Sequence, residues 1–224
     1  MIRLLCILIG YIFGLFQTAF FYGKLHGIDI RTVGSGNAGT TNTLRVLGTK
    51  AGLIVLLGDV AKTMIAILIV KLCIIPMDPA YQQMKYLLIL YTAAGAILGH
   101  NYPFYMGFKG GKGIAATAGL ILSFNPWFIL VGVLAFFIPF LITKYVSLGS
   151  LCIYFCFVVQ LIVMGQFGFF DGASQYMLYE MYAIAFFLMI MAYFRHRSNI
   201  VKLVKGTERK TYLFHKPDGH ENAQ

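Results

Sequence analysis

Charge is what this sequence lacks most. Only 12% of its 224 residues are charged, and eight of them are acidic. Soluble domains carry about a quarter charged residues. The low charge, together with 59% hydrophobic residues and a mean hydropathy of +0.77, excludes an ordinary soluble protein. The composition predicts an integral membrane protein.

Acidic and cysteine residues are also scarce, which limits the possible cofactors. The polar segments contain no paired carboxylates of the kind that hold Mg²⁺, so we expect no metal and no other cofactor. The four cysteines lie in apolar runs, where we expect them to pack as small hydrophobic side chains. The net charge of +10 comes without aromatic side chains interleaved on a soluble module. We therefore expect membrane lipid and phosphate as partners, and no nucleic acid.

Long apolar runs dominate the chain instead. A helix needs about 20 apolar residues to cross a hydrocarbon core of roughly 30 Å. We predict an all-α, polytopic integral membrane protein with seven transmembrane helices and one membrane-embedded domain, residues 1–224. The apolar segments are 4–22, 51–75, 84–99, 113–124, 127–142, 148–165 and 177–194. No small-x-small cleavage site follows the first, so we expect it to be retained.

The fourth segment, 113–124, is short for a membrane span. Either its outer end stops early, or its glycine-rich start lies below the lipid headgroups. Basic residues gather in alternate connections and in the tail, and such residues favour the cytoplasmic side. The pattern predicts an outer N-terminus and a cytoplasmic C-terminal tail, residues 194–224.

The segment 99–113, GHNYPFYMGFKGGKG, joins two of these apolar runs. Its glycines allow positive φ, and we expect them to turn successive N–H groups toward one point, as in an anion-binding nest. A helix starting near Lys112 adds the positive end of its dipole. The alternative is a simple connection with lysines in the headgroups. The candidate binding residues are His100, Gly107, Lys109, Gly110, Gly111, Lys112 and Gly113.

Two further polar segments carry candidate site residues. Segment 34–48 offers many neutral donors, and Arg45 presents a planar fork suited to a phosphate. Alone, it also fits a polar turn with a helix cap. Segment 195–208 is typical of a juxtamembrane basic anchor, but His196 and Asn199 lie three apart and share a helix face. The candidates are Ser35, Gly36, Asn37, Thr41, Asn42, Arg45, His196 and Asn199.

Together GSGNAGTTNTLRVLG, GHNYPFYMGFKGGKGIAAT and RHRSNIVKLVKGTE resemble, in order, the three signatures of the bacterial acyl-phosphate:glycerol-3-phosphate acyltransferase (PlsY) family. The resemblance covers nearly the whole chain. It implies transfer of a fatty acyl group from acyl phosphate to the 1-hydroxyl of glycerol 3-phosphate, giving lysophosphatidic acid and phosphate. It also implies a multi-pass protein of the bacterial inner membrane, a cytoplasmic active site, and a functional partnership with the enzyme that makes acyl phosphate.

The resemblance also implies roles for particular residues. Ser35, Arg45, His196 and Asn199 are implied to be important for activity, the glycines of the second segment to bind glycerol 3-phosphate, and Glu208 to be structural. Because one site must hold two phosphates, we expect cations to offset their repulsion. The expected cations are Arg45, Lys109, Lys112, Arg195 and Arg197. The general base stays open between His196 and a substrate phosphate.

Asp59 and Lys62 lie three apart inside an apolar run. Ionisable residues within a membrane span are functional-site candidates, yet such a pair also neutralises itself against a neighbouring helix. The sequence favours neither interpretation.

Two other functions compete with acyl transfer. A membrane transporter of a phosphorylated metabolite also needs basic and glycine-rich sites, although transporters tend to show repeated halves. A non-catalytic scaffold that binds anionic lipid through the basic tail leaves the glycine spacing unexplained.

Overall fold

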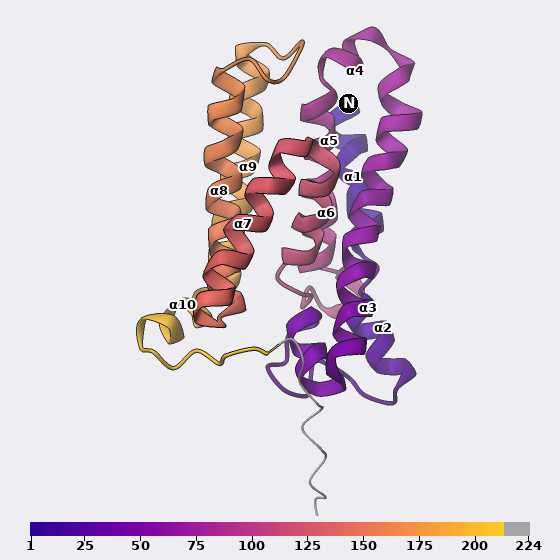
Figure 1. Ribbon diagram of the computed structural model, residues 1–224. Coiled ribbons are helices and arrows are strands. Elements are labelled where there is room, and N and C mark those ends of the chain that lie inside the picture. The colour runs from indigo at the N-terminus through magenta and orange to yellow at the C-terminus, as the bar shows by residue number, and fades with distance from the viewer. Residues whose placement is uncertain (213–224) are drawn as a thin grey trace, which may run out of the picture.

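The computed structural model describes residues 1–212, and every regular element within them is a helix (Figure 1). This confirms the all-α prediction. The elements are α1 (Ile2–Gly14), α2 (Thr18–Leu25), α3 (Thr40–Ile69), the π-helix η1 (Val70–Ile74), the 3₁₀ helix η2 (Ile75–Met77), α4 (Pro79–Gln83), α5 (Lys85–Asn101), the 3₁₀ helix η3 (Phe104–Met106), α6 (Ile114–Phe124), α7 (Pro126–Thr143), α8 (Val146–Gln166), α9 (Gln175–Arg195) and α10 (Arg197–Val204).

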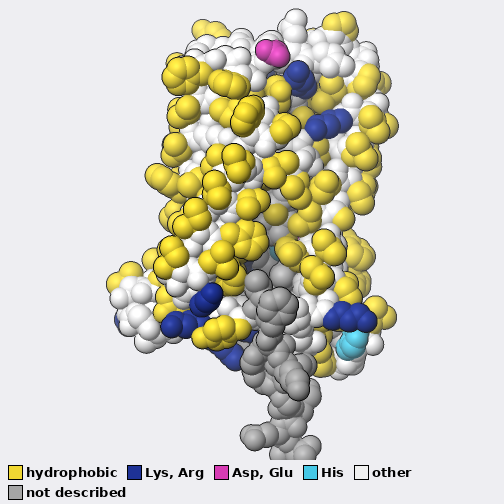
Figure 2. All heavy atoms as spheres, viewed as in Figure 1, with side chains coloured by type: hydrophobic (Ala, Val, Ile, Leu, Met, Phe, Trp, Pro, Cys, Tyr) yellow, Lys and Arg dark blue, Asp and Glu magenta, His cyan; other side chains and the backbone are white. Residues whose placement is uncertain are grey.

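Five helical stretches are long and apolar enough to cross a membrane. They are Ile2–Leu25, Thr40–Met77, Pro126–Thr143, Val146–Gln166 and Gln175–Arg195. The apolar α6 has only 11 residues, and α5 has 17. Figure 2 shows a hydrophobic band around the middle of the bundle, with lysine and arginine side chains near its two ends. This is the surface expected of a protein embedded in a bilayer.

The first apolar segment is not the single unbroken helix that its sequence predicts. It breaks between α1 and α2, and Gln17 at the break is fully buried. The Gln17 amide donates to the carbonyl oxygens of Gly14 at 3.2 Å and His100 at 3.0 Å. Helix ends leave such carbonyls without partners, so one buried side chain satisfies the ends of α1 and α5.

Helix α3 starts at Thr40, eleven residues before the predicted start at Ala51. It has two arms, because Gly48 adopts φ 84° and ψ 177° inside it. The arms pack closely, since a Cβ added to Gly52 lies 2.6 Å from the Cβ of Leu44. Much of segment 34–48 is therefore helical, and the kink brings it over the second arm.

Helices α1 and α5 pack against each other through four glycines. A Cβ added to Gly10 lies 1.9 Å from the carbonyl oxygen of Thr92, and one added to Gly14 lies 2.2 Å from that of Ala96. From the other side, Gly95 and Gly99 approach the backbone of α1 as closely. Small residues at four-residue spacing let two membrane helices approach this closely.

Helices α6 and α7 meet at Asn125, short of the end that α3 and α9 reach (Figure 1). The Lys71 ammonium donates to the carbonyl oxygen of Ser123 at the end of α6, and Asn125 caps α7 by accepting from the Trp127 N–H at 3.1 Å. The short fourth segment therefore stops early at the end of the bundle where the N-terminus lies (Figure 1).

The glycine contact predicts a strong effect of Gly10→Ala. The added methyl overlaps the backbone of α5, so we expect α1 and α5 to separate at a cost of about 1–3 kcal/mol in stability. Thermal unfolding of the purified protein in detergent measures this. Leu8→Ala, on the exposed side of the same helix, is the control. Equal midpoints for the two variants would show that the close contact is not needed.

Candidate active site

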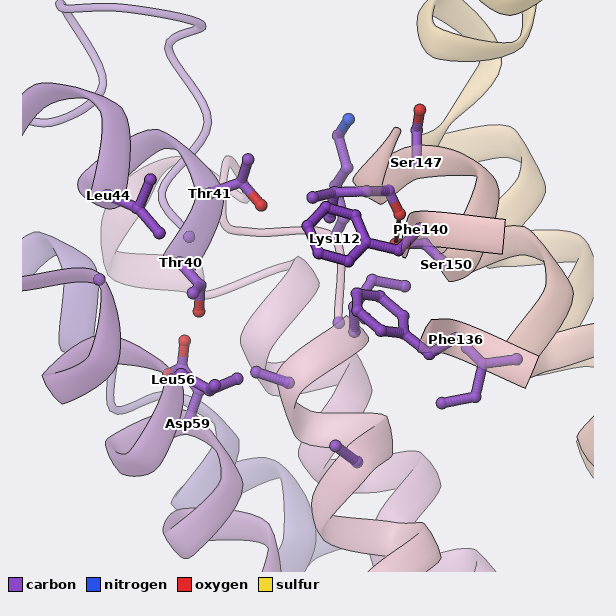
Figure 3. Close-up of a pocket in the computed structure, with 18 of the residues that line it drawn as sticks. Thr40, Thr41, Leu44, Leu56, Asp59, Lys112, Phe136, Phe140, Ser147 and Ser150 are labelled. Carbon is purple, nitrogen blue, oxygen red and sulfur yellow. Dashed lines mark hydrogen bonds between the residues drawn. The ribbon is translucent and has the colours of Figure 1, made fainter. Parts of the chain in front are cut away.

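One cavity of about 630 Å³ lies where the three polar segments meet (Figure 3). They gather at the end of the bundle where α2 and α10 lie, opposite the N-terminus (Figure 1). The polar part of the lining is Ser35, Asn37, Thr40, Thr41, Asn42, Arg45, Thr49, Asp59, His100, Lys112, Ser147, Ser150, His196, Asn199, Glu208 and Thr211. These residues come from α3, α5, α8 and α10 and from the non-helical segments before α3, before α6, between α9 and α10, and after α10.

The other side of the cavity is apolar. It is lined by Leu53, Leu56, Leu57 and Val60 of α3, Ile114, Ala118, Ile121 and Leu122 of α6, and Ile129, Val133, Phe136, Phe137 and Phe140 of α7. In Figure 3, Leu56 faces Phe136 and Phe140 across the space. Leu57 and Phe137 of this lining are exposed. The cavity thus joins a polar end to an apolar groove between α3 and α7.

Arg45 and Lys112 are the basic side chains that line the described cavity. The Arg45 guanidinium donates to Thr211 Oγ1 at 2.6 Å. Lys112 donates to Asn199 Oδ1. Burial lowers the pKa of Lys112 to about 8, so its ammonium persists at neutral pH. Gly113 caps the N-terminus of α6 in the same wall, and the free N–H groups of that helix turn favour an anion.

The third polar segment supplies a neutral histidine and an amide. His196 Nδ1 lies 2.8 Å from the carbonyl oxygen of Ala192. A carbonyl only accepts, so Nδ1 carries the hydrogen and Nε2 keeps a lone pair. Burial, with the nearby Lys112 charge, lowers the pKa of His196 to about 4. Asn199 donates to Glu208 Oε1 at 2.9 Å, so Glu208 orients the amide that accepts from Lys112.

Within the first polar segment, Asn42 holds the loop together. Its Oδ1 accepts from the Ser35 N–H at 2.7 Å, and its Nδ2 donates to the carbonyl oxygens of Ile30 and Val33, both at 3.0 Å. Ser35 is exposed at the cavity wall, and the Thr41 hydroxyl points into the cavity in Figure 3. Gly36 lies outside the lining and adopts φ 69°.

The predicted anion nest is wrong at Gly110 and Gly111. Their N–H groups donate to the carbonyl oxygens of Asn101 and His100, both at 3.1 Å, and so cap the end of α5. Within segment 99–113, positive φ occurs at Gly107, Phe108 and Gly113, and at neither Gly110 nor Gly111. Close packing requires the other two glycines, because a Cβ on Gly110 lies 2.0 Å from the His100 oxygen and one on Gly111 lies 2.1 Å from His100 Nε2.

Several predicted cations do not reach the cavity either. Lys109 is exposed and lies outside the lining of the cavity, as does Gly107, which was a predicted binding residue of the same loop. Arg195 donates to the carbonyl oxygens of Gly110 at 2.8 Å and Gly111 at 2.7 Å, so it fixes the glycine loop. Arg197 is exposed. Of the two lysines in segment 99–113, the structure brings only Lys112 to the site.

Asp59 and Lys62 form a buried network with His100. The Lys62 ammonium donates to Asp59 Oδ1 at 2.8 Å, His100 Nδ1 at 2.9 Å and the Phe16 carbonyl oxygen at 2.6 Å. All three residues of the network are at most 4% exposed. The sequence did not decide between a functional and a structural role for Asp59 and Lys62. The structure places Asp59 in the cavity wall and Lys62 behind it.

Ser147, Ser150, Thr40 and Thr211 line the cavity although the sequence gave no reason to select them. Ser147 Oγ is buried without a hydrogen-bond partner among residues 1–212. The only signal was a pair of hydroxyls three residues apart in the apolar run that forms α8.

The model of the glycerol-3-phosphate acyltransferase family matches residues 4–206. The chain belongs to this family. Glycerol-3-phosphate acyltransferases from Thermosipho melanesiensis and Clostridioides difficile are 40% and 37% identical to it, over 92% and 90% of this chain and 90% and 92% of theirs.

Two solved structures of a glycerol-3-phosphate acyltransferase are also similar. Crystal structures of PlsY, an integral membrane glycerol 3-phosphate acyltransferase, match 94% of this chain and 96% of theirs. The glycerol 3-phosphate form has a TM-score of 0.78 at 32% identity, and the lysophosphatidic acid form 0.75 at 31%.

The two explanations of the glycine loop predict different outcomes for Gly111→Ala. Steric packing predicts that the methyl displaces the His100 ring and costs about 1–3 kcal/mol in stability. Gly107→Asn is the control and should cost less, because its side chain meets open space and asparagine tolerates the φ of 63° at that position. Thermal unfolding of both variants measures the difference. A nest predicts weaker phosphate binding for both with little change in stability, and that result would restore the original interpretation.

Proposed function

We propose that this protein transfers a fatty acyl group from acyl phosphate to the 1-hydroxyl of glycerol 3-phosphate, releasing lysophosphatidic acid and phosphate. One observation carries the proposal: a single cavity joins Arg45 and Lys112 to an apolar groove between α3 and α7. An acyl phosphate has the same division, with an anionic head on a long alkyl chain.

The donor phosphate binds at the cationic end, and its chain lies in the groove. Glycerol 3-phosphate, a soluble dianion, enters from the polar end beside Ser35 and Thr41. Arg45, Lys112 and the N-terminus of α6 offset the repulsion between the two phosphates. Asn199 and Glu208 hold the Lys112 ammonium in place.

In the reaction, the glycerol hydroxyl oxygen forms an ester bond to the acyl carbonyl carbon, and the bond from that carbon to the phosphate oxygen breaks. The hydroxyl proton passes to His196 Nε2 or to a substrate phosphate. Because acyl phosphate is already activated, orientation and stabilisation of the developing oxyanion supply most of the acceleration.

The proposal includes a membrane arrangement. We place the protein in the bacterial inner membrane as one domain with seven passes, where α5 and α6 complete the five longer spans. The site faces the cytoplasm and the N-terminus the outside, because the basic connections lie at the end that carries the cavity. Acyl phosphate then reaches the groove from the bilayer after another enzyme has made it.

A direct assay tests the reaction. Purified protein with palmitoyl phosphate and radiolabelled glycerol 3-phosphate is expected to yield labelled lysophosphatidic acid, and palmitoyl-CoA is expected to give little or none. Lys112→Ala should lower kcat/KM at least about 100-fold, as expected for a cation at the reacting phosphates. Lys109→Ala, in the same loop but outside the cavity, should stay within about threefold.

No product from the wild type would exclude acyl transfer and favour the transporter. Equal losses for the two lysine variants would show that the cavity is not the site. The assay therefore tests separately whether the protein transfers acyl groups and whether the cavity is the active site.

Activity should fall at alkaline pH. Lys112 is protonated below its pKa of about 8 and loses its charge as the pH rises through that value. The kcat/KM for glycerol 3-phosphate should therefore fall about tenfold per pH unit above about 8, since this ratio reports the free enzyme. Lys112→Arg keeps its charge to higher pH and should remove the fall. An identical alkaline fall in Lys112→Arg would contradict this role.

A further inference from the structure

Only one of the two carboxylate oxygens of Asp59 has hydrogen-bond partners among residues 1–212. Its Oδ1 accepts from Thr18 Oγ1 at 2.9 Å and from the Lys62 ammonium at 2.8 Å. Its Oδ2 is buried and has no hydrogen-bond partner among residues 1–212. The side chain is 1% exposed and lines the cavity.

A second unpartnered oxygen lies near it. Thr40 Oγ1, at the start of α3, is also buried without a partner among the described residues, and Thr40 also lines the cavity. Figure 3 shows the Thr40 hydroxyl and the Asp59 carboxylate pointing toward one another from the two arms of α3. No hydrogen bond joins them within the described chain.

Two unpartnered polar atoms in one wall specify what can bind there. Buried polar groups without partners are costly, and native proteins seldom keep them unless a ligand or water satisfies them. A phosphate is repelled by the carboxylate. A cation is not required, because Lys62 already neutralises Asp59. A hydroxyl fits, because it donates to Asp59 Oδ2 and accepts from Thr40.

We propose that Asp59 and Thr40 bind the secondary hydroxyl of the acceptor, and so select a polyol monophosphate over a simple alcohol phosphate. This rests on the proposed function, which puts the acceptor in this cavity. A carboxylate that already accepts from an ammonium and a hydroxyl is a poor proton acceptor, so it binds the hydroxyl that is not acylated. Thr18 and Lys62 are positioning residues that keep Oδ2 turned to the cavity.

The test compares glycerol 3-phosphate with 3-hydroxypropyl phosphate, which keeps the reacting hydroxyl and lacks the secondary one. Calorimetric binding to the wild type, without any acyl donor, should favour glycerol 3-phosphate at least about tenfold, because the analogue leaves two buried groups unpaired. The acylation rate with each acceptor is measured separately.

Two variants should lower this preference. In Asp59→Asn, the amide oxygen stays with Lys62 and Thr18, so an NH₂ group replaces the acceptor that faces the cavity. In Thr40→Val, the hydroxyl is lost at nearly constant shape. Each variant removes one of the two proposed hydrogen bonds, so each should lower the preference roughly two- to tenfold, while Thr40→Ser keeps the hydroxyl and should keep the preference.

The outcomes separate the two proposals. Equal binding of both phosphates to the wild type, or an unchanged preference in Thr40→Val, would overturn the hydroxyl site, and the second result decides the matter even if Asp59→Asn does not fold. Selective binding without acyl transfer would overturn the proposed function and leave the hydroxyl site standing.

Discussion

The site depends on one buried ammonium. Lys62 of α3 donates to Asp59 in its own helix, to the Phe16 carbonyl between α1 and α2, and to His100 in α5. An ammonium in a low-dielectric interior is costly unless its donors are satisfied, and removing one partner of such a pair typically costs about 3–5 kcal/mol. Lys62 therefore fixes three segments relative to one another, and Asp59 and His100 both stand in the cavity wall that results.

The same network reaches the cations through close packing. The His100 ring lies against Gly111, and its carbonyl oxygen lies against Gly110. At the end of α9, Arg195 donates to the carbonyl oxygens of the same two glycines. This fixes the chain that leads to Lys112 and the start of α6. Lys112 then meets Asn199 of α10. Parts of the chain far apart in sequence are thus held around one charged end, while α3, α6 and α7 supply the apolar side.

The sequence predicted much of this site but not the reasons for it. Apolar run lengths predicted most of the helices, but neither the break at Gln17 nor the first arm of α3. The three polar segments predicted that Arg45, Lys112, His196 and Asn199 come together, and all four line one cavity. Glycines at Gly110 and Gly111 fit both a nest and tight packing, so only the contacts with His100 could separate the two. Lys109 and Lys112 look alike in sequence because nothing in the loop reveals which one turns inward. Thr40 and Ser147 are ordinary hydroxyls until the fold places them around a cavity.

The central claim is that one cavity holds both the phosphate and the acyl chain of the donor. A structure of the protein with a non-hydrolysable acyl phosphonate tests it most directly. We expect the phosphonate to contact Arg45 and Lys112 and the chain to lie between α3 and α7, against Leu56 and Phe136. A phosphonate bound away from both cations, or a chain lying elsewhere on the bundle, would contradict it.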